Sequence, residues 1–415
     1  MIDGEHYPPV VRDAIAAVPY DVVAAVLVGG TEKLRGEGAD YGVPLAGRLE
    51  DAIADYGPEL VLDLSDEPVL GPPERLRLAS RALAHGVPYA GADFRFDAPS
   101  FAPFDLPSLA VVGTGKRVGK TAVTGHVARL LAAGRRVVVV AMGRGGPREP
   151  ELVRVRPTVA DLVELSRAGR HAASDHLETA ALAGVETVGC RRCGGGLAGA
   201  VSVSNVLEGA RLAASLEPEL VVFDGSGAAL PPVAARRRVV VVGAHQDPAV
   251  ATGYLNAYRL HLADLVVVTM AEEGSGHEAL AASVRGLVRP GTPVVSTALR
   301  PRPAEPVAGR RVAYFGTAPV SEHARQAAHL ESVHGASVVH VSGNLADRAA
   351  LRAELPAVEA DVYVVELKAA AVDVVAEEAD ARGARVVLAA NDVLPLAGEP
   401  DLDAELVRLA EEAGA

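Results

Sequence analysis

Short apolar runs alternate with longer amphipathic stretches along nearly the whole chain of 415 residues. The apolar runs are rich in Val, Leu and Ala, and several are apolar throughout instead of alternating with polar residues. Runs of this kind are typical of strands in parallel sheets that are covered by helices on both faces. The hydrophobic pattern therefore predicts an α/β fold built on parallel sheets.

Two proline-containing segments divide the pattern into three blocks. We interpret residues 97–103 as a linker and residues 300–306 as a second joint. We therefore expect an N-terminal domain at residues 1–105, a central domain at 106–300 and a C-terminal domain at 301–415, the outer two being smaller and Rossmann-like. The N-terminal domain is a candidate lid or substrate wall. Strands are expected near residues 21–28, 60–64, 87–90, 109–112, 136–141, 186–189, 220–224, 239–243, 265–269 and 293–296.

The most informative motif is a glycine-rich loop between an apolar run and a helical stretch. Such a strand, loop and helix form a phosphate cradle: backbone N–H groups and the helix dipole face the anion, the lysine reaches the β- and γ-phosphates, and the threonine hydroxyl binds Mg²⁺. The spacing is longer than the usual Gly-x-x-x-x-Gly-Lys-Thr, which indicates a variant loop. We therefore predict a central P-loop NTPase domain that binds ATP and Mg²⁺. The predicted nucleotide-binding residues are Gly113, Thr114, Gly115, Lys116, Arg117, Val118, Gly119, Lys120 and Thr121.

Lysine is rare in this chain, which makes its positions informative. Only four of the 40 basic residues are lysine, and the rest are arginine. Lys116 and Lys120 lie in the phosphate loop, while Lys33 and Lys368 follow predicted strands. A compact ammonium and a planar guanidinium are not interchangeable at a phosphate. Lys33 and Lys368 are therefore candidate substrate-binding residues, although both can equally be solvated surface lysines.

Polar groups follow several of the predicted strands, where open parallel sheets bind their ligands. Asp224 ends one strand and is positioned to hold Mg²⁺ opposite Thr121. Arg144, Gly145 and Gly146 follow the strand after the phosphate loop, where the arginine can clamp phosphate oxygens and glycines let the backbone approach an anion. Asp175, at a predicted helix start, can orient Mg²⁺ or substrate, or simply cap the helix.

Other motifs carry weaker signals. Cys190 and Cys193 supply only two ligands, so ordinary thiols are favoured over a structural zinc site. The glycine-rich residues 194–199 can form an anion loop or a flexible turn. His6 is either an acid/base group or, more simply, a structural histidine. Arg300 is a weak candidate for contact with the adenine base.

Composition limits the partners. The net charge of −13 argues against a general role on nucleic acid or membrane surfaces. No apolar stretch reaches spanning length without charges, the first residues lack the pattern of a signal peptide, and two cysteines cannot form a disulfide framework. We therefore expect a cytoplasmic protein that binds neither nucleic acid nor membrane and is compatible with a homodimer.

Five segments together resemble the cyclic 2,3-diphosphoglycerate synthetase family. They are residues 3–8, 29–33, 113–121, 142–147 and 366–370, and they extend over essentially the whole chain. The phosphate loop alone also resembles that of dethiobiotin synthetase. The resemblance implies a ligase that converts ATP and 2,3-diphosphoglycerate into cyclic 2,3-diphosphoglycerate, ADP and phosphate. It also implies catalytic roles for Lys116, Lys120, Arg144 and Asp224, with Arg144 on the substrate.

Two other functions remain open from the residues alone. A kinase of 2-phosphoglycerate or another small acid would use the same loop but release no free phosphate. A nucleotide-switched P-loop protein would have conformational change as its output, but two additional α/β blocks exceed what a switch needs.

Overall fold

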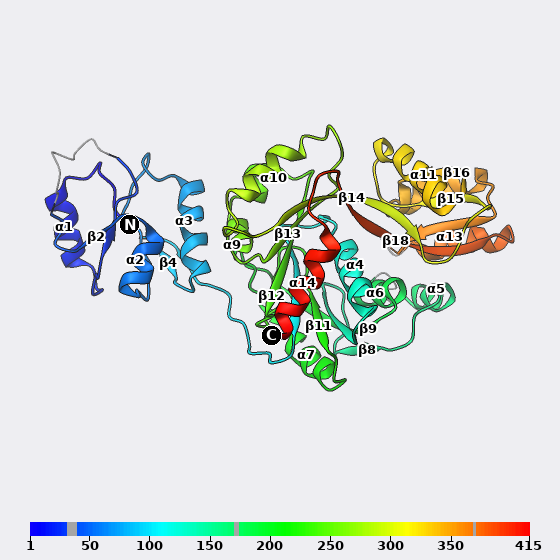
Figure 1. Ribbon diagram of the computed structural model, residues 1–415, viewed down its shortest axis with the longest axis horizontal. Coiled ribbons are helices and arrows are strands. Elements are labelled where there is room, and N and C mark those ends of the chain that lie inside the picture. The colour runs from blue at the N-terminus through cyan, green and yellow to red at the C-terminus, as the bar shows by residue number, and fades with distance from the viewer. Residues whose placement is uncertain (31–39, 170–173, 368–370) are drawn as a thin grey trace.

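The dominant feature is a 13-stranded sheet through the central and C-terminal parts of the chain, beside an N-terminal lobe with two small sheets (Figure 1). This computed structural model describes residues 1–30, 40–169, 174–367 and 371–415. The chain is an α/β protein with a large, mostly parallel sheet, a central P-loop domain, and further domains at either end. The hydrophobic pattern thus predicts the class of fold correctly.

The central part of the sheet consists of strands that are parallel to one another, with two short antiparallel strands beside β9. In spatial order they are β10 (Val203–Ser204), β9 (Glu186–Cys193), β7 (Val137–Gly143), β11 (Leu220–Asp224), β6 (Ser108–Gly113), β12 (Arg237–Gly243), β13 (Leu265–Thr269) and β14 (Val294–Pro303), while β8 (Glu151–Val153) pairs with β9.

Both faces of these strands are buried, which explains their continuous apolar sequence. In β7, Val138 and Val140 contribute to one hydrophobic cluster, whereas Val137 and Val139 contribute to another. Successive side chains of a strand point to opposite faces, so a run of valines fills two cores at once. Helices cover these faces: α4 (Lys120–Ala132), α6 (Asp175–Ala183), α7 (Val206–Ala214), α8 (Pro248–Ala251), α9 (Asn256–His261) and α10 (His277–Arg285). Helix α5 (Val159–Arg167) instead packs against the C-terminal part of the chain.

The expected joint at residues 300–306 is wrong, because most of it is strand. Strand β14 continues to Pro303 and pairs antiparallel with β18 (Arg385–Pro395). Pro301 and Pro303 are two residues apart, so both lie on the same side of the ladder, and a strand tolerates proline where its N–H would face away from the partner. The sheet therefore crosses without a break from the central domain into the C-terminal domain (Figure 1).

Beyond this antiparallel junction the C-terminal domain is again a parallel sheet with helices. Strand β18 is parallel to its next neighbour, and the spatial order is β18, β17, β15, β16. The elements are β15 (Arg311–Phe315), α11 (Val320–His334), β16 (Ser337–Ser342), η1 (Asn344–Ala346), α12 (Arg348–Glu354), η2 (Leu355–Ala357), β17 (Val362–Glu366) and α13 (Val372–Ala381).

The last helix, α14 (Leu402–Gly414), leaves the C-terminal domain and packs on the central one. Its buried Leu402, Leu406 and Leu409 belong to the same hydrophobic cluster as Leu109 of β6 and Val123 of α4. The final helix of the expected C-terminal domain at residues 301–415 thus lies on the central domain, because its apolar face completes that core. The bounds expected for the three domains otherwise stay a prediction.

The N-terminal lobe contacts the central domain through helix α3 (Pro72–Ala84) and shares a hydrophobic cluster with it. Its elements are α1 (Pro8–Ala17), β1 (Ala25–Val26), β2 (Leu45–Ala46), α2 (Leu49–Tyr56), β3 (Val61–Leu62), α3 (Pro72–Ala84), β4 (Tyr89–Ala90) and β5 (Arg95–Phe96). Helix α3 lies against α9 (Figure 1). A lid role for this lobe stays a prediction. Within the described ranges, no helix is long and apolar enough to cross a membrane.

Candidate active site

The glycine-rich loop lies where the sequence places it, between a buried strand and a helix. Strand β6 ends at Gly113, and α4 begins at Lys120. Gly119 precedes the helix with φ of +77°, and a Cβ there would lie 3.0 Å from Thr269 Oγ1. Lys116 and Arg117 are exposed at the tip of the loop, whereas Lys120 is buried. The loop thus presents cations to solvent, and its helix begins with the lysine expected at a phosphate.

Two side chains that sequence reasoning missed hold this loop in place. Thr114 Oγ1 donates to Gln246 Oε1 at 2.6 Å. Gln246 Oε1 also accepts a hydrogen bond from the N–H of Gly243 at 3.0 Å. Thr269 Oγ1 donates to the carbonyl of Val118 at 2.6 Å. Gln246 and Thr269 follow or end neighbouring strands β12 and β13. Their position at carboxyl ends of parallel strands is the signal that could have identified them.

Replacing Gln246 with Ala is expected to weaken nucleotide binding about tenfold, because Thr114 and Gly243 lose the oxygen that joins them and the loop is less well ordered before binding. Calorimetric titration with a non-hydrolysable ATP analogue measures this. The adjacent His245→Ala serves as a control, since His245 is exposed. Equal affinities for Gln246→Ala and the unmodified chain would contradict a positioning role for Gln246.

Behind the loop lies a buried ion pair. Lys120 Nζ donates to Asp224 Oδ1 at 2.5 Å, and Thr124 Oγ1 donates to the same oxygen at 2.7 Å. The side chain of Lys120 is 9% exposed, and that of Asp224 is 0% exposed. Burial raises the pKa of Asp224, while Lys120 acts in the opposite direction. Asp224 is therefore a carboxylate held at the end of the phosphate loop and not a solvated turn residue.

The second oxygen of Asp224 is suited to a cation. Oδ2 is buried and has no hydrogen-bond partner among the described residues. A buried, unpartnered carboxylate oxygen is costly unless a ligand completes it, and oxygen is the donor that Mg²⁺ prefers. Asp224 thus fits the expected metal position.

The other two expected metal ligands are placed differently. Asp175, at the first position of α6, is close enough to Asp224 to act on its pKa. Thr121 lines a small cavity with Thr179 of α6 and Asn391 of β18. The hydroxyl that donates to Asp224 belongs to Thr124, four residues after Lys120 and so on the same face of α4. Metal binding by Thr121 and Asp175 stays a prediction.

A second group of cations lies beside this pair, on β7 and β9. Arg144 follows β7 and is exposed. Arg192 of β9 donates through Nη1 to the carbonyl of Gly194 at 3.0 Å and through Nη2 to that of Ser226 at 2.9 Å. Burial, and then the nearby charge of Arg144, lower the pKa of Arg192, whereas Asp175 acts in the opposite direction. Sequence reasoning did not single out Arg192.

The structure explains why a glycine occupies position 146, two residues after Arg144. A Cβ on Gly146 would lie 2.0 Å from the carbonyl oxygen of Cys190, so only glycine allows this loop to approach β9 so closely. Gly145 is exposed beside it. The close approach brings the segment that carries Arg144 against β9. Contact of Gly145 and Gly146 with an anion stays a prediction.

Several other candidates lie away from this site. The carboxylate of Glu272 accepts from Arg300 at 2.6 and 2.8 Å, so this arginine is already paired. His6 shares a hydrogen bond of 2.8 Å with the buried Asp3, whose carboxylate raises the pKa of the imidazole. Lys33 and Lys368 lie outside the described residues.

The two cysteines do not form a metal site. Both lie on β9, three positions apart, so their side chains point to opposite faces of the sheet. Cys190 is buried, and burial raises its pKa to about 12, which leaves an unreactive thiol, while Cys193 is exposed. The favoured interpretation as ordinary thiols agrees with this geometry.

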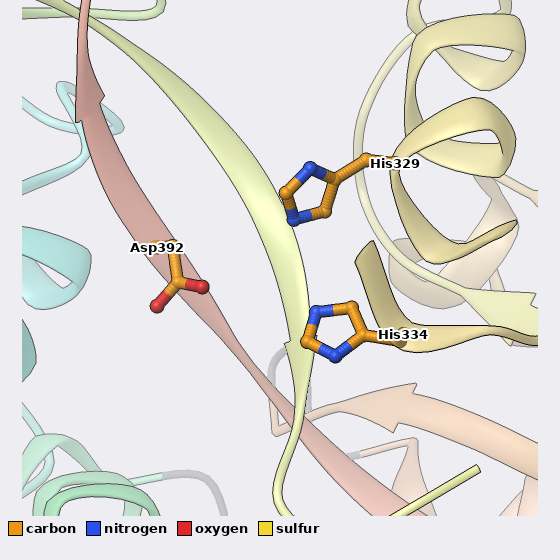
Figure 2. Close-up of side chains that lie close together, drawn as sticks. All are labelled: His329, His334 and Asp392. Atoms are coloured by element: carbon orange, nitrogen blue, oxygen red, sulfur yellow. The ribbon is translucent and has the colours of Figure 1, made fainter. Parts of the chain in front are cut away.

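One further group has the spacing of metal ligands. His329 and His334 extend from α11 toward β18, which carries Asp392, and the three ligand atoms lie within 4.8 Å of one another (Figure 2). However, Oδ1 of Asp392 lies 3.1 Å from both Arg129 Nη2 and Arg302 Nε. Two guanidinium groups already exceed the charge of this carboxylate, so an added divalent cation would be repelled. We interpret the group as a contact between domains.

Comparison with known proteins covers all three parts of the chain. Family models of cyclic 2,3-diphosphoglycerate synthetase match at residues 1–97 (N-terminal domain), 108–297 (P-loop domain) and 303–392 (C-terminal domain). Among solved structures, LpxK from Aquifex aeolicus in complex with ATP gives a TM-score of 0.45 at 15% identity, covering 75% of this chain and 90% of its own, which is too distant to support an argument.

Curated relatives match over nearly their full length. A cyclic 2,3-diphosphoglycerate synthetase of Rubrobacter xylanophilus is 54% identical over 100% of this chain and 97% of its own length. An enzyme of the same name from Thermococcus gammatolerans is 45% identical over 96% of this chain and 94% of its own length. The one from Methanothermus fervidus is 40% identical over 94% of this chain and 91% of its own length. The similarity therefore includes both outer domains as well as the phosphate loop.

Proposed function

The chain belongs to the cyclic 2,3-diphosphoglycerate synthetase family, and from this premise we propose that it uses ATP to close an intramolecular phosphoanhydride in 2,3-diphosphoglycerate. The observation that carries the proposal is the 54% identity over the whole chain to a bacterial enzyme of that name. The products are cyclic 2,3-diphosphoglycerate, ADP and inorganic phosphate. Nucleotide binding itself follows from the P-loop domain.

Two lysines and an arginine of the loop supply the charge that ATP requires. Lys120 is paired with Asp224 at the end of the loop. We infer that ATP takes over the ammonium through its β- and γ-phosphates, while the exposed Lys116 and Arg117 close over the same phosphates. The buried helix start and the N–H groups of the loop add positive potential at this point.

Oδ2 of Asp224, the carboxylate oxygen that does not accept from Lys120, is suited to Mg²⁺. Asp224 would hold it, with Thr121 and Asp175 as further candidate ligands. When bound, Mg²⁺ neutralises charge on the transferring phosphoryl group. The residues of this chain do the remaining work: Lys120 holds the γ-phosphate in line, and Arg144 brings a substrate phosphate oxygen toward it.

The reaction then proceeds in two balanced displacements. An oxygen of one substrate phosphate attacks the γ-phosphorus of ATP, forming a new P–O bond while the bond to the β-phosphate oxygen breaks and ADP leaves. The first substrate phosphate now carries the former γ-phosphoryl group. An oxygen of the other substrate phosphate attacks the phosphorus of this first substrate phosphate, and the former γ-phosphoryl group leaves as inorganic phosphate as the ring closes. Both steps bring phosphate anions together, so positioning and charge neutralisation are the main requirements of the site.

The proposal is tested by ³¹P NMR of the purified chain with Mg-ATP and 2,3-diphosphoglycerate. We expect new phosphoanhydride resonances that grow together with ADP and free phosphate in equal amounts. ATP that stays intact, or that is consumed without change in the diphosphoglycerate resonances, would contradict this substrate. Phosphorylation of 2-phosphoglycerate without release of free phosphate would instead indicate a kinase.

A further inference from the structure

Two arginines lie at the ends of β7 and β9, beside the buried pair Lys120–Asp224. Met142 is in register with Cys190, and Gly143, the last residue of β7, with Arg191. Arg144 directly follows β7, so it leaves the sheet at the edge where β9 carries Arg192. The loop of Arg144 packs against β9 at Cys190, and the charge of Arg144 is close enough to disfavour that of Arg192.

Within the described ranges, neither Arg144 nor Arg192 forms an ion pair with a carboxylate. Most arginines of this chain with a described role pair with a carboxylate, as Arg81 does with Glu50 and Arg348 with Asp373. Among the described residues, Arg192 donates only to the carbonyls of Gly194 and Ser226, and its Nε is buried without a partner. The charge of Asp175 acts on Arg192 and favours its charged form. Adjacent, incompletely paired guanidinium groups are what an anion site requires.

The position of the pair relative to ATP is fixed by the sheet. From the loop strand the order is β6, β11, β7, β9. Asp224 ends β11, Arg144 follows β7, and Arg192 lies on β9, so the arginines continue outward from the buried pair Lys120–Asp224. Arg192 also touches the segment of Asp224 directly, through the carbonyl of Ser226. Neighbouring strands are about 5 Å apart, which suits two anions on adjacent atoms.

We propose that Arg192 and Arg144 form a two-part clamp in which Arg192 binds the second phosphate of the substrate and so makes the enzyme specific for a bisphosphorylated acid over a monophosphorylated one. This inference rests on the proposed function, since the substrate there carries phosphates on adjacent carbons. Arg144 holds the phosphate nearer to ATP, and Arg192 holds the other. Each guanidinium presents a planar fork to phosphate oxygens, which lysine does not.

A purely structural role for Arg192 makes different predictions. If the guanidinium served only to hold the carbonyls of Gly194 and Ser226, its loss would loosen the segment after Asp224. Nucleotide binding and stability would then fall, and both acids would be affected alike. A clamp predicts an effect confined to the second phosphate.

The test is calorimetric binding to the full chain, with Mg²⁺ and a non-hydrolysable ATP analogue present. The two probes are 2,3-diphosphoglycerate and 2-phosphoglycerate. We expect Arg192→Gln to weaken 2,3-diphosphoglycerate binding at least tenfold and to leave 2-phosphoglycerate and the ATP analogue within about twofold. Arg192→Lys, which keeps the charge, should lie between. Arg191→Gln is the matched control, because Arg191 is exposed and one position along the same strand.

The outcomes separate this inference from the proposed function, because binding needs no turnover. Equal losses for both acids, or a parallel loss of ATP analogue affinity, would overturn the clamp even if the ring closure is seen by NMR. A wild-type chain that does not prefer the bisphosphate would overturn it too. Selective loss in Arg192→Gln supports the clamp even if the reaction proves to be a different phosphoryl transfer. Arg192→Lys keeps the test valid should the Gln variant not fold.

Discussion

Replacing Lys120 with Ala is expected to lower kcat by about 10³-fold or more, because the loop then lacks the one buried cation that can reach the β- and γ-phosphates. The exposed Lys116 and Arg117 cannot compensate, since solvent screens their charge and no side chain in the described part of the chain holds them in place. Steady-state release of phosphate from Mg-ATP and 2,3-diphosphoglycerate measures the effect. Near-normal turnover would remove the phosphate loop from the mechanism.

The same substitution also tests the ion pair. Removing Lys120 leaves the fully buried Asp224 without its counter-charge, which costs about 3 kcal/mol of unfolding free energy for a buried pair of this kind. The pKa of Asp224 is already raised by burial, and losing Lys120 raises it further. A carboxyl whose pKa is higher in the folded than in the unfolded chain stabilises the fold fully below its unfolded pKa. This stabilisation is lost as the pH rises through the folded pKa. The deficit of Lys120→Ala should therefore be small in acid and full at neutral pH.

A double variant separates the two effects. Lys120→Ala with Asp224→Asn removes both charges, so stability at neutral pH should largely recover, while turnover stays abolished. Denaturant unfolding at acid and neutral pH gives the stabilities. Lys116→Ala is the control for stability, as Lys116 is exposed. If the double variant is no more stable than Lys120→Ala, the buried charge is not the source of the loss.

The local features of the site could be predicted because each depends on a few neighbouring residues. The strand, loop and helix around Lys120 follow from an apolar run, glycines and a helical stretch in immediate succession. Asp224 follows from its place at the end of a buried strand. Both are consequences of strand geometry that a single sequence carries. The pairing of Lys120 with Asp224, 104 residues apart, is then implied by adjacent parallel strands.

The remaining features depend on contacts that no local pattern encodes. Arg192 lies in a segment whose cysteines and glycines drew attention to metal and anion loops, and its nearness to Arg144 depends on the register of β7 with β9. Gln246 becomes informative only once β12 is known to lie beside β6. Pro301 and Pro303 suggest a joint by composition, yet the ladder with β18 accommodates them.

Helix α14 is the clearest case of a contact decided at long range, and it yields a second prediction with a large effect on stability. Its apolar face is an ordinary amphipathic pattern that would suit either domain. In the structure Leu406 is fully buried in the core that contains Val123 and Val127 of the P-loop helix α4. Asp403 also lies 2.7 Å from His126 of that helix. The end of the chain is thus part of the nucleotide-binding domain.

Leu406→Ala is accordingly expected to lower the unfolding free energy of the central domain by about 3 kcal/mol, through lost burial and the cavity left behind. Leu197→Ala is the matched control: Leu197 is 67% exposed, so its truncation should change stability by less than about 0.5 kcal/mol. Urea unfolding with and without an ATP analogue identifies the domain, because a ligand raises the midpoint only of the transition it is linked to. The midpoint that Leu406→Ala lowers should be the one that the analogue raises. If the substitution instead shifts a transition that the analogue leaves unmoved, α14 stabilises the C-terminal domain and not the one that holds ATP.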